Sequence, residues 1–162
     1  MKKSGQTAAQ FNSQKPQEMS QTNPFDLEQA LESLLAQDPE TAHMSLMYDL
    51  TDRLEGSDQA FTFAPAVLLF MERHPEVDFG GPGPLVHYLE KFYRNGYEEL
   101  LIDSFRRRPT PHTAFMMNRL INGSSGEVKA EYLALLRGAS DRTDIDESSL
   151  EALANFVKLH TE

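Results

Sequence analysis

The chain has 162 residues, of which 40% are hydrophobic and 25% charged, a composition typical of one soluble domain that can bury a core. No apolar run approaches the roughly 20 residues needed to cross a bilayer, and the polar start Met1–Gln6 predicts no secretory signal. The absence of cysteine excludes a disulfide framework, a thiol nucleophile and a thiolate metal site. We therefore expect a cytosolic protein that does not insert in a membrane.

The net charge of −10 is unevenly distributed along the chain. Residues 25–60 hold nine acidic side chains and one basic side chain, whereas residues 61–126 are balanced. This balance disfavours nucleic acid as a ligand, because phosphate is bound mainly by Lys and Arg. The acidic segment either attracts a basic protein partner or only keeps the protein soluble.

Residues 1–22 are polar and rich in glutamine, which predicts a disordered tail that buries too little apolar surface to order itself. Residues 23–162 are expected to form one helical domain. Its first helix follows Asn23-Pro24, and the second begins at the cap Asp38-Pro39-Glu40 and ends at Gly56. The third, from about Thr62 to Arg73, is apolar on nearly every side and is predicted to be central.

The second half of the chain repeats this punctuation of caps, prolines and glycines. Five more helices are predicted: they begin at Gly83-Pro84, at Tyr97, at Thr110-Pro111 and at Ser125, and the last surrounds Leu153. The fifth ends in Arg106, Arg107 and Arg108, where cations suit the helix dipole, and the seventh is expected to stop at Arg137, before Gly138.

These segments and the lack of hairpin signals predict an all-α protein of about eight short helices. Short connections favour antiparallel helical hairpins in a small solenoid-like stack, and Met47-Tyr48 and His87-Tyr88 recur 40 residues apart. A globular bundle of the same helices is the alternative.

The chemistry-bearing residues show no enzyme pattern. The five histidines are widely spaced, and His87 with Glu90 forms a single i, i+3 pair, whereas a di-metal bundle needs two such pairs. No serine elbow or phosphate-binding loop is present. We therefore predict a protein that is not an enzyme and needs no cofactor or metal.

The segment Asp78–Pro84 combines three glycines with two prolines. Such a segment forms a stiff turn, because proline restricts the chain and glycine permits positive φ. The same stiffness suits a loop shaped for a partner, so both interpretations stay open. In the predicted sixth helix, Asn118 and Asn122 form an i, i+4 pair, and Arg119 follows Phe115 by four residues. These side chains bridge either within the fold or to a partner.

Several blocks of the sequence resemble one family of small helical proteins whose genes are found beside those of bacterial polymorphic toxins. The blocks are Glu72–Glu90, Tyr97–Leu101, Arg108–Thr113 and Met117–Asn122, within a similarity that spans roughly residues 44–137. Most of its specificity comes from the run Gly81–His87 and from the run that begins at Pro109-Thr110 and ends in Asn118–Asn122. The polar start and the acidic segment 25–60 have no counterpart in the resemblance.

The resemblance implies a cytosolic immunity protein that binds and neutralises a cognate toxin, and the acidic charge is compatible with a basic nuclease toxin. A helical adaptor or scaffold in an unrelated cytosolic assembly is the alternative. Acidic side chains near the end of the second helix oppose its dipole, which favours a binding role for them. The residues predicted to contact the protein partner are Asp49, Asp52, Glu55, Asp58, Phe79, Gly81, Pro82, His87, His112, Asn118, Arg119 and Asn122.

Overall fold

The computed structural model describes residues 25–35 and 42–162 of the chain. Within these ranges it contains eight α-helices, one short 3-10 helix and no strand, which confirms the all-α class. The predicted tail 1–22 and the predicted cap at residues 38–40 lie outside the described residues. The elements are α1 (Leu27–Ser33), α2 (Ala42–Glu55), η1 (Ala60–Phe63), α3 (Ala64–Arg73), α4 (Gly83–Glu90), α5 (Tyr97–Arg107), α6 (Pro111–Asn122), α7 (Gly126–Ser140) and α8 (Glu147–Leu159).

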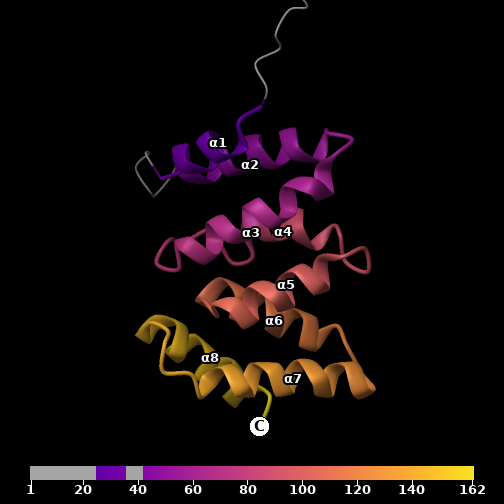
Figure 1. The fold of residues 1–162 in the computed structure, drawn as a ribbon, viewed down its shortest axis with the longest axis vertical. Coiled ribbons are helices and arrows are strands. Elements are labelled where there is room, and N and C mark those ends of the chain that lie inside the picture. Colours follow the sequence, from indigo (N-terminus) through magenta and orange to yellow (C-terminus); the bar gives the residue numbers. More distant parts are fainter. Residues whose placement is uncertain (1–24, 36–41) are drawn as a thin grey trace, which may run out of the picture.

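The helices follow one another down the long axis of the molecule, from α1 and α2 at one end to α7 and α8 at the other (Figure 1). Several helices pack on the next helix but one along the chain: α2 packs on α4, α3 on α5 and α6 on α8. The connections therefore gather at the two long edges of the molecule. One edge holds the end of α2, the α4–α5 turn and the α6–α7 turn (Figure 1).

Local capping explains where several helices begin. The Thr110 side chain accepts the Thr113 N–H, and the Thr113 hydroxyl in turn accepts the Thr110 N–H at 2.9 Å, which completes a capping box ahead of Pro111 in α6. Asp146 caps α8 by accepting the Ser149 N–H at 2.9 Å. These side chains satisfy amides that have no partner inside the helix.

Two helix boundaries differ from those predicted. The third helix is divided into the 3-10 helix η1 and α3, so that Ala64 rather than Thr62 begins the α-helix. In addition, α7 continues through Gly138 to Ser140, because burial of Leu136 and Ala139 on both sides of the glycine outweighs its low helix propensity. The prediction of a helix end at Gly138 was wrong.

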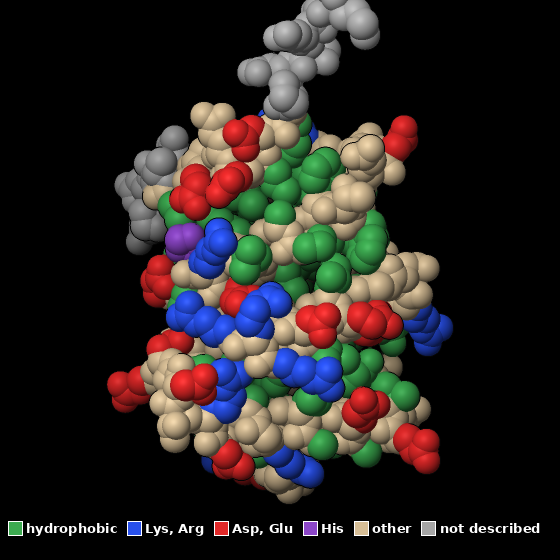
Figure 2. Space-filling model, in the orientation of Figure 1, with side chains coloured by type: hydrophobic (Ala, Val, Ile, Leu, Met, Phe, Trp, Pro, Cys, Tyr) green, Lys and Arg blue, Asp and Glu red, His purple; other side chains and the backbone are tan. Residues whose placement is uncertain are grey.

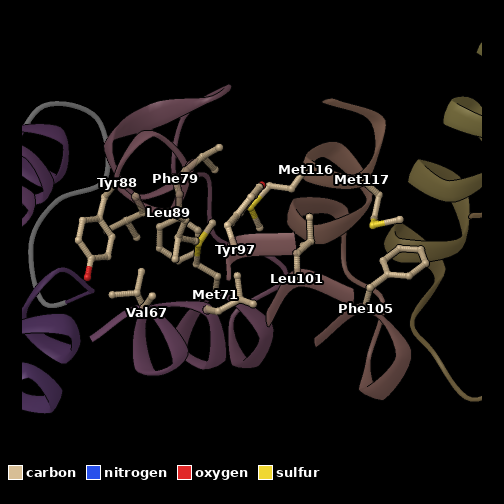
Figure 3. Close-up of a cluster of buried hydrophobic side chains, with 14 of the residues drawn as sticks. Val67, Met71, Phe79, Tyr88, Leu89, Tyr97, Leu101, Phe105, Met116 and Met117 are labelled. Carbon is tan, nitrogen blue, oxygen red and sulfur yellow. The ribbon is translucent and has the colours of Figure 1, made fainter. Parts of the chain in front are cut away.

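The core runs continuously through the layers of helices. Figure 3 shows its side chains following one another from Tyr88 beside α3 to Phe105 beside Met117. Helix α3 buries Val67, Leu68, Phe70 and Met71, as its apolar sequence predicted. The 40-residue recurrence does not extend to burial, since Tyr88 is fully buried whereas Tyr48 is 54% exposed.

A buried carboxylate crosses the interface between α3 and α5. Glu72 accepts a hydrogen bond from the Ser104 hydroxyl at 3.0 Å and three from the Arg107 guanidinium, the shortest at 2.7 Å. This contact raises the pKa of Arg107 above its usual value, and the hydrogen bond to Glu72 is the largest cause. Arg107 therefore joins two helices, in addition to its favourable place at the end of α5.

Candidate protein-binding surfaces

The outer face of α2 exposes an aromatic side chain among carboxylates. Tyr48, Asp49 and Asp52 are all exposed, and Met44 lies one turn before Tyr48 with 38% of its surface accessible. Because residues three and four apart share a helix face, Met44, Tyr48 and Asp52 form one line along α2, with Asp49 beside it. We call Met44, Tyr48, Asp49 and Asp52 the α2 strip.

The carboxylates of the α2 strip are electrostatically uncompensated. Neither Asp49 nor Asp52 forms an ion pair with a cation in the described part of the chain, and the same holds for Asp58 in the following turn. Glu55 differs, since it is half-buried and pairs with Lys91 at the end of α4. The sequence therefore grouped four acids of which three keep their charge available for a partner.

The turn between α3 and α4 is built around glycines and Asp78. The Asp78 carboxylate accepts the Gly80 N–H at 2.8 Å, and Gly80 and Gly83 adopt φ of 90° and 74°. A Cβ on Gly80 would lie 2.8 Å from the Gly83 Cα, so the turn closes too tightly for a side chain there. The turn prediction for this segment is confirmed, and the Gly81–Pro82 peptide bond is cis.

Phe79 belongs to the core and not to a partner surface, because only 1% of it is exposed. Its ring packs against Phe70 of α3 and His112 of α6, with centroid separations of 5.6 and 4.9 Å. The turn thus places an apolar side chain where two helices meet, which corrects the prediction for Phe79. Gly81 is exposed and Pro82 is half-buried, so both remain accessible.

His112 is half-buried beside the turn and connects it to α6. Its Nε2 lies 3.1 Å from the His74 carbonyl oxygen, with which it forms a hydrogen bond. Burial lowers the pKa of His112 below its usual value, although the backbone contact and the nearby Asp78 and Glu76 oppose this shift. His112 and Gly81 also line a shallow apolar groove of about 450 Å³ between the turn, α6 and α8.

Asn118 is also an interior residue, with 8% of its surface exposed. Its side-chain oxygen lies 2.8 Å from Nε2 of His160, so it ties α6 to the residue that follows α8. The prediction of a partner contact was wrong here, because the polar group is used to close the C-terminal part of the fold. Its i, i+4 neighbour Asn122 is exposed at the end of α6.

The ends of α4 and α6 meet where Arg119 of α6 pairs with Glu90 of α4. His87 of α4 and Asn122 of α6 lie on the same two helices. Arg119 donates to both carboxylate oxygens of Glu90, at 2.9 Å for Nη2 to Oε2, and its guanidinium lies 5.7 Å from the Phe115 ring centroid. His87 is exposed, with Nδ1 3.6 Å from the same carboxylate. Glu90 therefore connects α4 to α6 through Arg119, and His87 of the i, i+3 pair lies beside the same carboxylate.

Sequence reasoning missed the exposed aromatic and basic residues beside these helix ends. Tyr93 and Arg94 lie in the α4–α5 turn, and the Arg94 guanidinium is 5.4 Å from the Tyr93 ring centroid. The Arg94-Asn95-Gly96 sequence marks a turn, but nothing in it predicts which side chains point outward. Figure 2 shows Lys and Arg side chains across the middle of one face, below an area of exposed hydrophobic side chains.

The described residues contain no group of three or more His, Asp or Glu side chains placed to hold a metal ion. Among the same residues, no helix is long and apolar enough to span a membrane. Comparisons with protein-family models, curated proteins and solved structures gave no match.

Proposed function

We propose that this protein is an immunity-type inhibitor that binds a cognate bacterial toxin domain and covers its working surface. The resemblance of residues 44–137 supports the class of partner. The α2 strip supports the mode of binding, because it joins an exposed tyrosine to carboxylates that no described cation neutralises. Aromatic side chains are favoured at protein interfaces, and uncompensated charge directs a partner of opposite sign.

The charge of the strip selects a basic partner. A toxin that cuts nucleic acid presents such a surface, since it must bind phosphate with Lys and Arg. A protein that docks an acidic face on that surface excludes the substrate by occupying the same place. Inhibition of this kind requires no chemistry from the inhibitor, only a rigid face and a high rate of association.

Rescue of cells tests the proposal directly. A toxin-like C-terminal domain encoded by a neighbouring gene is the partner that this proposal requires, and it would be expressed in bacteria with and without the full-length chain. We expect growth to stop without this chain and to recover with it, together with a stable complex after purification. If the chain binds no neighbouring toxin and gives no recovery, the immunity proposal is wrong and the adaptor alternative replaces it.

Association kinetics test the α2 strip. Asp49→Asn with Asp52→Asn is expected to slow association with the toxin by about three- to tenfold at low salt and to flatten its salt dependence. The matched control is Glu131→Gln with Glu151→Gln, which changes the charge equally on the exposed surfaces of α7 and α8. Equal rates for the two double variants would show that the strip is only a solvated surface.

A further inference from the structure

A cleft of about 580 Å³ opens where the α4–α5 turn meets the end of α6. Tyr93 and Arg94 contribute one side, Arg119 and Asn122 the other, and Tyr97 from the first turn of α5 also lines it. All but Tyr97 are exposed. With Glu90, which also lines it, the cleft combines two guanidinium groups, one carboxylate, an amide and two aromatic rings, which is a set suited to a polar group on an apolar stem.

The charges of the cleft are unequal in availability. Arg119 is occupied by Glu90, to which it donates two hydrogen bonds. Arg94 forms no ion pair within the described ranges of the chain, and its guanidinium rests near the Tyr93 ring. The uncompensated charge among the lining side chains is therefore the cation of Arg94, which favours an anionic ligand.

The backbone holds Arg94 at this place. Its φ is 62°, in the left-handed region that a non-glycine residue seldom adopts, and its N–H donates to both Glu98 carboxylate oxygens at 3.0 Å. Glu98 therefore stabilises a turn that projects Arg94 from the end of α4. The next side chain toward α5 is Asn95, and Gly96 completes the turn with φ of 103°.

Tyr97 adds a hydrogen-bond donor without a partner. It is 98% buried by relative surface, and its hydroxyl contacts no hydrogen-bonding group in the described part of the protein. Burial is the largest cause that raises the pKa of this hydroxyl. The carboxylates of Glu90 and Glu98 raise it further, while Arg119 lowers it. The phenol therefore stays protonated, and both charges of the Glu90–Arg119 pair act on its pKa.

The α4–α5 turn, whose side chains line the cleft, lies at the same edge of the molecule as the end of α2 (Figure 1). The Glu55–Lys91 ion pair joins that end to the start of the α4–α5 turn, and the Phe61 ring packs on Phe92 at 5.1 Å between centroids. The Glu90 carboxylate lines the cleft and the Glu98 carboxylate lies at the Arg94 N–H, so a polyanion would be repelled more strongly there than a single carboxylate. A single carboxylate on an otherwise basic protein therefore fits the one cation of Arg94 better.

We infer that the cleft between the α4–α5 turn and α6 receives an aspartate or glutamate side chain of the protein partner, bound by the Arg94 guanidinium beside Tyr93 and Asn122. This inference rests on the proposed function for the existence of the partner. It adds a contact of opposite sign to the acidic strip of α2. Two contacts of opposite sign fix the orientation of a partner, because a rotated complex would bring like charges together.

Titration of the full-length chain with N-acetyl-L-glutamate tests the cleft without a toxin. We expect saturable NMR shifts at the Arg94 side-chain Nε–H, the Asn122 amide and the amides of residues 93–97, and none with N-acetyl-L-glutamine. Arg94→Gln should weaken binding at least fivefold, whereas Arg106→Gln, at an exposed arginine on α5, should not. Arg94→Lys keeps the charge and should give an intermediate affinity.

The contrary results are equally definite. Unsaturable shifts, equal shifts with the glutamine compound, or binding that Arg94→Gln leaves unchanged would overturn the inference. Inorganic phosphate that binds as well as the glutamate compound would also overturn it, by showing a general anion site. Unfolded variants are recognised by circular dichroism, and the Lys variant then decides.

The complex with the toxin separates this inference from the proposed function. We expect Arg94→Gln to raise the dissociation rate about tenfold, and Asp49→Asn with Asp52→Asn to act on the association rate. A toxin complex that Arg94→Gln does not affect contradicts the inference and leaves the immunity function intact. Absence of any toxin complex contradicts the function, while the titration still decides the chemistry of the cleft.

Discussion

The turn between α3 and α4 and the outer face of α2 were both predicted as partner contacts, and they have opposite environments. In the turn, Phe79 is directed inward and meets Phe70 and His112, so the glycines serve to bring an aromatic ring into the core. On α2, Tyr48 remains 54% exposed beside Asp49 and Asp52. Phe79 therefore belongs to the core, whereas Tyr48 lies on the surface, although both have polar neighbours in the sequence.

The same contrast between interior and surface holds for two carboxylates. The charge of Glu72 is compensated by Arg107, and its carboxylate also accepts a hydrogen bond from Ser104, so it contributes to helix packing. Asp49 is a carboxylate without such partners among the described residues, and its field extends into solvent. Stability is expected to depend on the first kind of residue and recognition on the second.

Phe79→Ala should have the largest effect on the fold. Removing a buried phenylalanine leaves a cavity between α3 and α6, and we expect the free energy of unfolding to fall by about 3–5 kcal/mol. Chemical denaturation followed by circular dichroism measures this loss. Tyr48→Ala is the control and should change stability by less than about 1 kcal/mol, because its ring is exposed. Similar losses for both would contradict the contrast between turn and strip.

Arg107→Ala should have the next largest effect. The substitution leaves the Glu72 carboxylate buried with Ser104 alone, at a cost of about 2–3 kcal/mol. The neighbouring Arg106→Ala removes an exposed cation and should cost less than about 0.5 kcal/mol. Equal stability of the two variants in urea denaturation would mean that Glu72 reaches water once Arg107 is lost.

The stability of the fold should also depend on pH through His112. The folded pKa of His112 lies below its usual value of 6.5, so the unfolded chain binds more protons in the interval between them. Its contribution to stability is therefore full above pH 6.5 and decreases as the pH falls toward the folded pKa. Urea denaturation at pH 7.5 and 5.5 should show a smaller loss for His112→Gln than for the natural chain. Identical losses would show that His112 titrates alike in both states.

Asp49→Asn with Asp52→Asn should have the smallest effect on stability. These side chains are exposed, and Asp52 lies near the C-terminal end of α2, where negative charge opposes the helix dipole. We expect a change within about 0.5 kcal/mol, neutral or slightly stabilising, by thermal denaturation. A large loss would show that the carboxylates have structural partners, and the slower association expected above would then need another explanation.

The sequence by itself determined the helical class, most helix boundaries and the central place of α3, because these follow from local spacing of apolar residues and from caps such as Thr110. It also located the acidic segment and the stiff turn. Candidate residues were less predictable, since sequence spacing places a side chain on its own helix but not against the next one.

Only the tertiary structure decided which candidates face solvent. Phe79 and Asn118 are enclosed by α6 and by the residue after α8, from which they are 33 and 42 positions away along the chain. Arg94 and Tyr97 line one cleft with Asn122, more than 20 residues further on. Such neighbours are set by the packing of whole helices, in which one apolar face is buried against another far along the sequence, and local pattern carries no record of that pairing.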